Sequence, residues 1–230
     1  MDLTDSPTVN RRMVQSVRGS SFTVALAPEA LVAIQAGTLR ARYRGRLFRK
    51  NPFDMAIYTQ LLESLRPATI VEFGSLEGGC ALWFRDQCLV LNLDCVLHSI
   101  DLQPPQADLA GIAFHAGDAR NPEGTFPSEV LSAAPHPWLV VEDSAHTYEA
   151  CRTVLDYFDQ RLESGDYIVI EDGVVAELPG PQYAAYEDGP NRAVAEFLDT
   201  QGGRYVIDED CCDFYGHNVT FCPNGWLRRA

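Results

Sequence analysis

The sequence predicts an α/β fold built on a doubly wound, mostly parallel sheet. After residue 50, short apolar segments alternate with segments of helical periodicity, an order that places helices on both faces of a parallel sheet. The apolar segments are nearly continuous and lack the alternation of a half-exposed strand. One of them, residues 69–73, leads into a glycine-rich turn that opens a helix, and several others end in acidic residues. This arrangement is typical of Rossmann-like domains, which bind nucleotide-like ligands at the carboxyl edge of the sheet.

An N-terminal extension precedes the alternating segments. Residues 1–20 are polar and irregular, and we expect them to form an arm. Residues 27–45 carry one apolar stripe at helical spacing, and residues 55–65 predict a second helix with a buried face. We therefore expect an arm and a helix over residues 1–50, as a lid or an oligomer contact, ahead of one domain over residues 51–230.

The alternating segments give the order of elements in that domain. The predicted strands are residues 69–73, 96–101, 111–116, 138–142 and 167–171. The predicted helices are residues 79–89, 125–134, 147–164 and 190–201. Beyond them, residues 205–207 and 219–221 are apolar runs around a polar loop, and they predict a C-terminal antiparallel hairpin added to the sheet.

Composition and charge exclude several classes of function. With 230 residues, 46% of them hydrophobic, the chain suffices for one sizeable globular domain. Its net charge of −14 argues against a nucleic-acid partner, whose phosphates require clustered Lys and Arg. No apolar run approaches the roughly 20 residues of a membrane span, and the first residues lack the features of a secretory signal. We therefore expect a cytoplasmic protein with no membrane partner, and the 7 scattered cysteines agree with a reducing compartment.

A basic stretch before the second helix interrupts this acidic chain. Its charged residues are Arg40, Arg42, Arg44, Arg46, Arg49 and Lys50. Two interpretations stay open: a solvated or subunit-contacting face, and a contact with an anion or with the substrate.

The glycine-rich turn follows an acidic residue. Glu72 precedes Gly74 by two residues, and the pair Gly78-Gly79 follows. This spacing departs from the Gly-x-Gly-x-x-Gly dinucleotide fingerprint and resembles the first motif of class I S-adenosylmethionine (SAM)-dependent methyltransferases. An ordinary strand-to-helix turn is the alternative. Asp101 ends the next strand, where an acid accepts hydrogen bonds from ribose hydroxyls, a feature shared with NAD enzymes.

Acidic residues at two further strand ends predict a metal site. Asp143 follows the strand at 138–142, and the pair Glu171-Asp172 ends the next strand. Because these strand ends meet at one edge of the sheet, we expect the three carboxylates to share one coordination sphere, and oxygen ligands favour Mg²⁺ over Ca²⁺ or Mn²⁺. Capping of the following helices by the same acids is the alternative. His146 lies beside the cluster, where a neutral imidazole takes a proton near pH 7.

Several stretches together resemble the family known as cephalosporin hydroxylases, whose members are similar to Mg²⁺-dependent, SAM-dependent O-methyltransferases such as rhamnosyl O-methyltransferases. The stretches are residues 50–58, 72–81, 143–149, 171–173 and 224–229. The resemblance implies that the cofactor contacts are Glu72, Gly74, Ser75, Gly78, Asp101, Gly117, Asp118 and Asp143. It also implies that Asp143, Glu171 and Asp172 bind Mg²⁺ and that His146 or Asp143 is the catalytic base.

The predicted activity is methyl transfer from SAM, assisted by Mg²⁺, to a hydroxyl of a small molecule such as a sugar or an antibiotic-type specialised metabolite. The resemblance further implies a homo-oligomer. Two alternatives stay open. One is a non-catalytic SAM-binding subunit that assists a hydroxylase in a natural-product pathway, and the other is an NAD-dependent oxidoreductase.

Overall fold

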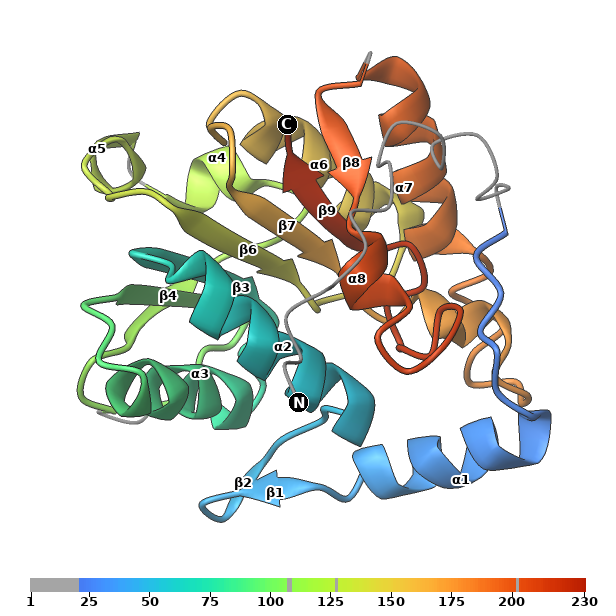
Figure 1. Ribbon diagram of the computed structural model, residues 1–230. Coiled ribbons are helices and arrows are strands. Elements are labelled where there is room, and N and C mark those ends of the chain that lie inside the picture. Colours follow the sequence, from blue (N-terminus) through green and yellow to red (C-terminus); the bar gives the residue numbers. More distant parts are fainter. Residues whose placement is uncertain (1–20, 107–108, 127, 202) are drawn as a thin grey trace, which may run out of the picture.

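The computed structural model describes residues 21–106, 109–126, 128–201 and 203–230, so the predicted arm at residues 1–20 lies outside the described residues. A seven-stranded sheet forms the centre of the fold (Figure 1). In spatial order its strands are β5 (Ala113–Ala116), β4 (Val96–Asp101), β3 (Thr69–Phe73), β6 (Trp138–Glu142), β7 (Tyr167–Ile170), β9 (Trp226–Arg229) and β8 (Tyr205–Ile207). The first five run parallel to one another, and β9 runs antiparallel to both β7 and β8. The predicted α/β fold class is confirmed.

Helices cover both faces of the sheet and enclose two apolar cores (Figure 1). The longer helices are α1 (Pro28–Thr38), α2 (Pro52–Leu65), α3 (Gly79–Val90), α6 (Tyr148–Asp159) and α7 (Gly189–Thr200). In β6, Leu139 and Val141 join the core under α2 and α3, whereas Val140 joins the core under α6 and α7. Successive strand residues point to opposite faces, so a strand covered on both sides needs an unbroken apolar run. Within the described ranges, no helix has the length and apolarity needed to cross a membrane.

The helix predicted over residues 27–45 is shorter than expected. It ends at Thr38, and a small antiparallel hairpin of β1 (Arg42–Tyr43) and β2 (Arg46–Leu47) follows. The two residues between these strands, Arg44 and Gly45, have φ values of 49° and 84°. Left-handed backbone at both positions is the geometry of a two-residue hairpin turn, and it is incompatible with a continuing helix.

The helix predicted over residues 125–134 is also wrong as a single element. Two short helices, α4 (Pro122–Thr125) and α5 (Ser128–Ser132), take its place. Between them, Phe126 has extended backbone, with φ −104° and ψ 125°, and its side chain is buried in the core under α6 and α7. The chain leaves the helical conformation where this aromatic residue enters the core.

The predicted C-terminal hairpin exists with a different second strand. β8 pairs with β9, which also joins β7 and so connects the hairpin to the parallel strands. Residues 219–221 form a loop. The assignment of this run as a strand was wrong because its backbone and side chains are held by a buried carboxylate of α2.

That carboxylate is Asp54, which is fully buried in the first turn of α2. Its oxygens accept hydrogen bonds from the Asn51 side chain, from the Thr220 hydroxyl and, at 3.2 Å, from the Phe221 N–H. Burial raises the pKa of Asp54 to about 6, although these donors favour the charged form. Because every partner is a donor, the site is specific for an acceptor and ties the C-terminal loop to the start of α2.

Replacing Asp54 by Asn tests this tie. An amide NH₂ in Asp54→Asn would face donors, and we expect the free energy of unfolding at pH 8 to fall by about 3 kcal/mol. Urea denaturation monitored by circular dichroism measures the change. Glu63→Gln, at an exposed position of the same helix, is the matched control and should leave the midpoint nearly unchanged. Equal stability of the two variants would show that the Asp54 network does not support the fold.

Candidate active site

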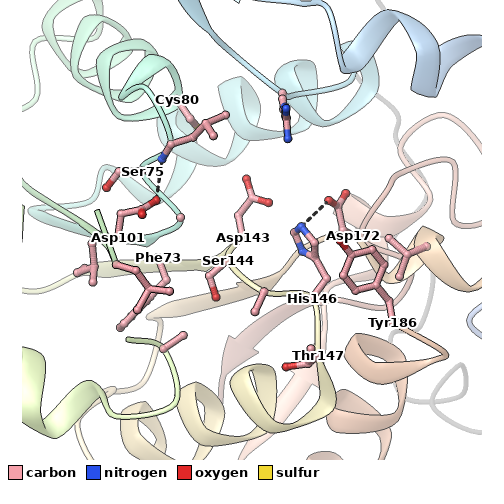
Figure 2. Close-up of a pocket in the computed structure, with 18 of the residues that line it drawn as sticks. Phe73, Ser75, Cys80, Asp101, Asp143, Ser144, His146, Thr147, Asp172 and Tyr186 are labelled. Carbon is pink, nitrogen blue, oxygen red and sulfur yellow. Dashed lines mark hydrogen bonds and ion pairs between the residues drawn. The ribbon is translucent and has the colours of Figure 1, made fainter. Parts of the chain in front are cut away.

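A cavity of about 540 Å³ lies at the carboxyl edge of the parallel strands. The turns after β3, β4 and β6 contribute Gly74, Asp101 and Asp143 to its lining (Figure 2). Residues of α1 and the residues Tyr183 and Tyr186 also line it. The cavity therefore joins the sheet edge, where the predicted site residues lie, to segments outside the sheet.

The turns after β3 and β6 approach each other closely at Gly74. Its φ is 104°, and a Cβ at this position would lie 2.0 Å from the backbone oxygen of Asp143. The Asp143 N–H donates to the Phe73 carbonyl at 2.9 Å, which fixes the two turns together. A glycine is required because any side chain would displace the backbone that carries Asp143.

The neighbouring residues of the turn have separate structural roles. The Ser75 and Ser99 hydroxyls are hydrogen-bonded at 2.7 Å, and Ser75 lines the cavity. Gly78 is the residue before α3 and has φ 79°. It does not line the cavity; its left-handed backbone lets the chain enter α3 directly after the turn.

Glu72, in β3, is a buried carboxylate with one oxygen uncommitted. Oε2 accepts a hydrogen bond from the Ser99 hydroxyl. Oε1 is buried and has no hydrogen-bond partner among the described residues. Burial raises the pKa of Glu72. An unpaired buried acceptor is costly, so this position suits a ligand that supplies a donor.

Two further acids follow the neighbouring strands. Asp101 lines the cavity and accepts the backbone N–H groups of Leu76 and Gln103, each at 2.9 Å. Asp118 lines it beside Gly117 and is paired with Arg120 at 2.7 Å. Hydrogen bonds from Arg120 lower the pKa of Asp118. Both carboxylates are thus hydrogen-bond acceptors held in fixed orientations at the cavity.

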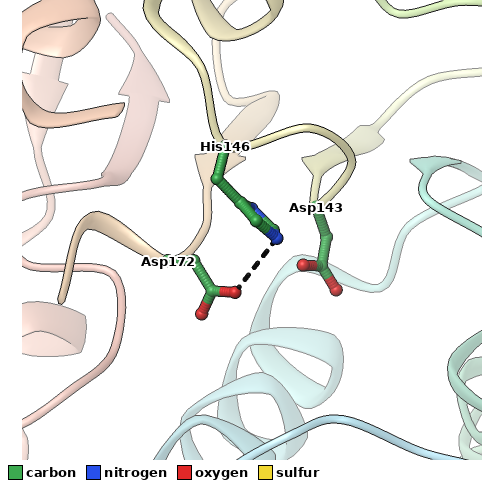
Figure 3. A group of neighbouring side chains, drawn as sticks. All are labelled: Asp143, His146 and Asp172. Atoms are coloured by element: carbon green, nitrogen blue, oxygen red, sulfur yellow. Dashed lines mark ion pairs between the residues drawn. The ribbon is translucent and has the colours of Figure 1, made fainter. Parts of the chain in front are cut away.

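Asp143, His146 and Asp172 converge on one point of the cavity (Figure 3). One ligand atom from each residue lies within 4.8 Å of the other two. His146 Nε2 is 3.4 Å from Asp172 Oδ2. His146 and Asp172 have φ values of 51° and 56°, and left-handed backbone at non-glycine residues is typical of functional sites. This group has the ligand atoms that a divalent cation needs, and its imidazole has the chemistry of a general base.

Glu171 is not a member of this group. Its oxygens accept from the Lys50 ammonium at 2.5 Å and from the Tyr58 hydroxyl at 2.6 Å. Lys50 is 4% exposed and also donates to Asp143. Burial and the charge of Asp143 raise the pKa of Glu171. Burial alone would lower the pKa of Lys50, but the charges of Asp143 and its neighbours raise it, so the ammonium stays charged.

The structure thus brings together most, but not all, of the residues singled out by the sequence. The predicted residues that line the cavity are Gly74, Ser75, Asp101, Gly117, Asp118, Asp143, His146 and Asp172. Glu72, Gly78 and Glu171 lie outside its lining. Lys50 was missed as a site residue, since it was grouped with the basic stretch. The sequence feature that could have identified Lys50 is its position directly before Asn51, the N-cap residue of α2.

The chain is similar to several known proteins. Residues 37–230 match the family described as rhamnosyl O-methyltransferase/CmcI. A rhamnosyl O-methyltransferase of Mycobacterium leprae is 28% identical over 194 residues, which cover 78% of this chain and 79% of that protein. One of Mycobacterium tuberculosis is 25% identical over 199 residues, covering 83% and 78%. A solved structure of CmcI with Mg and SAM has 29% sequence identity and a TM-score of 0.61, covering 84% of this chain and 77% of that chain.

Removal of the buried ammonium gives a direct test of the acidic cluster. Lys50→Met leaves Asp143 and Glu171 without their shared cation, and we expect the free energy of unfolding to fall by roughly 3 kcal/mol. Millimolar MgCl₂ should restore part of this loss, because a divalent cation would neutralise the same edge. Thermal unfolding with EDTA and with MgCl₂ measures both effects. Arg40→Met removes an exposed charge of the same basic stretch, outside the cavity lining, and serves as the control; identical behaviour of the two variants would contradict the assignment.

Proposed function

The chain belongs to the rhamnosyl O-methyltransferase/CmcI family and is a SAM-dependent O-methyltransferase; we propose that its cavity methylates a hydroxyl of a small molecule such as a sugar or a specialised metabolite. The observation that carries this proposal is a single cavity that joins Phe73, Gly74 and Ser75 at the end of β3 to the group of Asp143, His146 and Asp172. Its cofactors are SAM and Mg²⁺. Membership of this family leaves no support for an NAD-dependent oxidoreductase.

We assign the sheet edge to SAM. Glu72 stays a predicted contact for the ammonium of the methionine part: its Oε1 accepts no hydrogen bond from a nitrogen or oxygen of the described residues, although the carboxylate lies outside the cavity lining in this structure. Gly74 and Ser75 allow close approach of the backbone, and Gly78 lets α3 begin directly after this turn. Asp101 keeps acceptor capacity for ribose hydroxyls beyond its two backbone hydrogen bonds. Gly117 and Asp118 would then face the adenine.

We assign Mg²⁺ to Asp143 and Asp172, whose carboxylate oxygens are the hard ligands that this ion prefers. The fit rests on the convergence of their oxygens with His146. Glu171 remains a predicted ligand that is engaged by Lys50 and Tyr58 in this structure. When bound, SAM supplies an electrophilic methyl group, and Mg²⁺ lowers the pKa of a coordinated hydroxyl.

Proton transfer and alignment of the reactants are assigned to side chains of the protein. His146 Nε2 faces the point where the ligand atoms converge and is placed to accept the proton of the acceptor hydroxyl. Asp172 Oδ2 lies 3.4 Å from that nitrogen, so it would accept a hydrogen bond from Nε2–H after the proton has moved to the ring. The cavity walls hold donor and acceptor in line and exclude water, which an in-line displacement requires.

Two properties of the whole protein complete the proposal. We propose a cytoplasmic protein, because six of the seven cysteines are buried as small apolar residues, which suits a reducing compartment. We also keep a homo-oligomer as a proposal, for which the acidic chain and its basic stretch offer complementary charges. Light scattering of the purified protein decides the oligomeric state.

Asp143→Asn separates cofactor binding from catalysis. Calorimetry with SAM should give a micromolar Kd for the wild type and a change below about threefold in the variant, because Glu72 and the glycine turn are intact. Formation of S-adenosylhomocysteine (SAH) from a panel of hydroxylated acceptors with MgCl₂ should fall at least 100-fold, since the metal site loses a charged ligand. His217→Gln, at an exposed position, is the control. Full activity of Asp143→Asn would refute the metal-assisted mechanism, and absence of SAM binding by the wild type would refute the function.

A further inference from the structure

α1 closes the cavity although it belongs to neither helical layer of the sheet (Figure 1). Leu31 anchors it in a small apolar cluster that includes Val174, Leu178 and Phe221. Gln35 and Thr38, one helical turn apart, lie on one face of α1 and both line the cavity. The helix thus presents polar side chains to the space beside the catalytic group.

These two side chains contain polar atoms without partners. Gln35 Oε1 and Thr38 Oγ1 are buried, and within the described residues neither has a hydrogen-bond partner. Native proteins seldom leave buried polar atoms unsatisfied. The occurrence of two such atoms on one face of one helix, at a cavity, indicates that a bound molecule completes their hydrogen bonds.

The opposite side of this space is aromatic. The Tyr183 hydroxyl accepts a hydrogen bond from Gln35 Nε2 at 3.2 Å and keeps its own proton to donate. Tyr186 packs edge-on against the imidazole of His146, with ring centroids 5.6 Å apart (Figure 2). A molecule in contact with Tyr186 and α1 therefore reaches the catalytic histidine at one end.

We propose that α1 and the tyrosines form an acceptor subsite for a polyhydroxylated ring, a pyranose, whose hydroxyls remote from the methylated oxygen bond to Gln35 and Thr38. The Gln35 amide oxygen accepts hydrogen bonds, the Thr38 hydroxyl both donates and accepts, and the Tyr183 phenol can donate. This set matches the hydroxyl groups of a sugar, each of which can donate and accept. The aromatic rings fit the C–H face of a sugar. Gln35 and Thr38 are then specificity-determining residues. This inference rests on the proposed function, because it places the acceptor of that same reaction.

The experiment measures binding before turnover. Methyl α-L-rhamnopyranoside, methyl α-D-glucopyranoside and catechol are titrated by calorimetry into protein saturated with SAH and MgCl₂. We expect saturable binding of at least one pyranoside, weakened about tenfold or more by Thr38→Val or by Gln35→Leu. Thr38→Ser, which keeps the hydroxyl, should bind as the wild type does, and so should Val32→Ala on the exposed side of α1.

A second measurement separates recognition from structure. Thr38→Val removes an unsatisfied buried hydroxyl, so the melting temperature of the ligand-free variant should equal or exceed that of the wild type, and its Kd for SAM should be unchanged. With a pyranoside that is methylated, KM should rise and kcat should stay within about threefold. Binding of catechol alone, or of none of the probes, would overturn the subsite while SAM binding leaves the proposed function standing. Failure to bind SAM would overturn both.

Discussion

The acidic edge of this sheet depends on the ion pairs made by the buried ammonium of Lys50. It joins carboxylates from the ends of two neighbouring strands, Asp143 after β6 and Glu171 after β7. Tyr58 of α2 donates to Glu171 from the other side. Without this cation, two neighbouring buried carboxylates would repel each other and draw in water. A single cation from the chain before α2 therefore lets the sheet carry several acids at one edge and still pack its helices tightly.

The backbone at this edge is as constrained as its charges. Gly74 lets the β3 turn lie against the Asp143 carbonyl, and the left-handed residues His146 and Asp172 turn their side chains into the same cavity. The left-handed backbone of these two non-glycine residues is unfavourable in isolation, and the surrounding structure maintains it. The sheet thus pre-orients an imidazole and two carboxylates, and such pre-orientation is the condition for charge stabilisation without reorganisation.

Sequence reasoning located this edge because the chemistry follows strand ends, and strand ends were visible as apolar runs closed by acids. It could not separate Glu171 from Asp172, since adjacent residues leaving a strand point to different sides and only the packed structure shows which side is the cavity. It missed Lys50 because a charge run gives no sign that one member is buried. The run at 219–221 failed similarly: its apolar pattern suggested a strand, whereas a distant partner, Asp54, holds it as a loop.

Chemistry and recognition occupy different parts of this fold. The residues that handle charge and proton transfer stand on strand ends between two large cores, where substitutions disturb packing on both faces. Gln35 and Thr38 stand on α1, which is held by a small separate apolar cluster. A change on α1 alters the cavity without entering either main core, so acceptor preference can change while the methyl-transfer site keeps its geometry. The same separation explains why the sequence indicated the reaction more clearly than the acceptor. The residues proposed for the reaction follow strand ends, which the sequence pattern shows, whereas the residues proposed for acceptor recognition lie on one face of a helix outside the sheet.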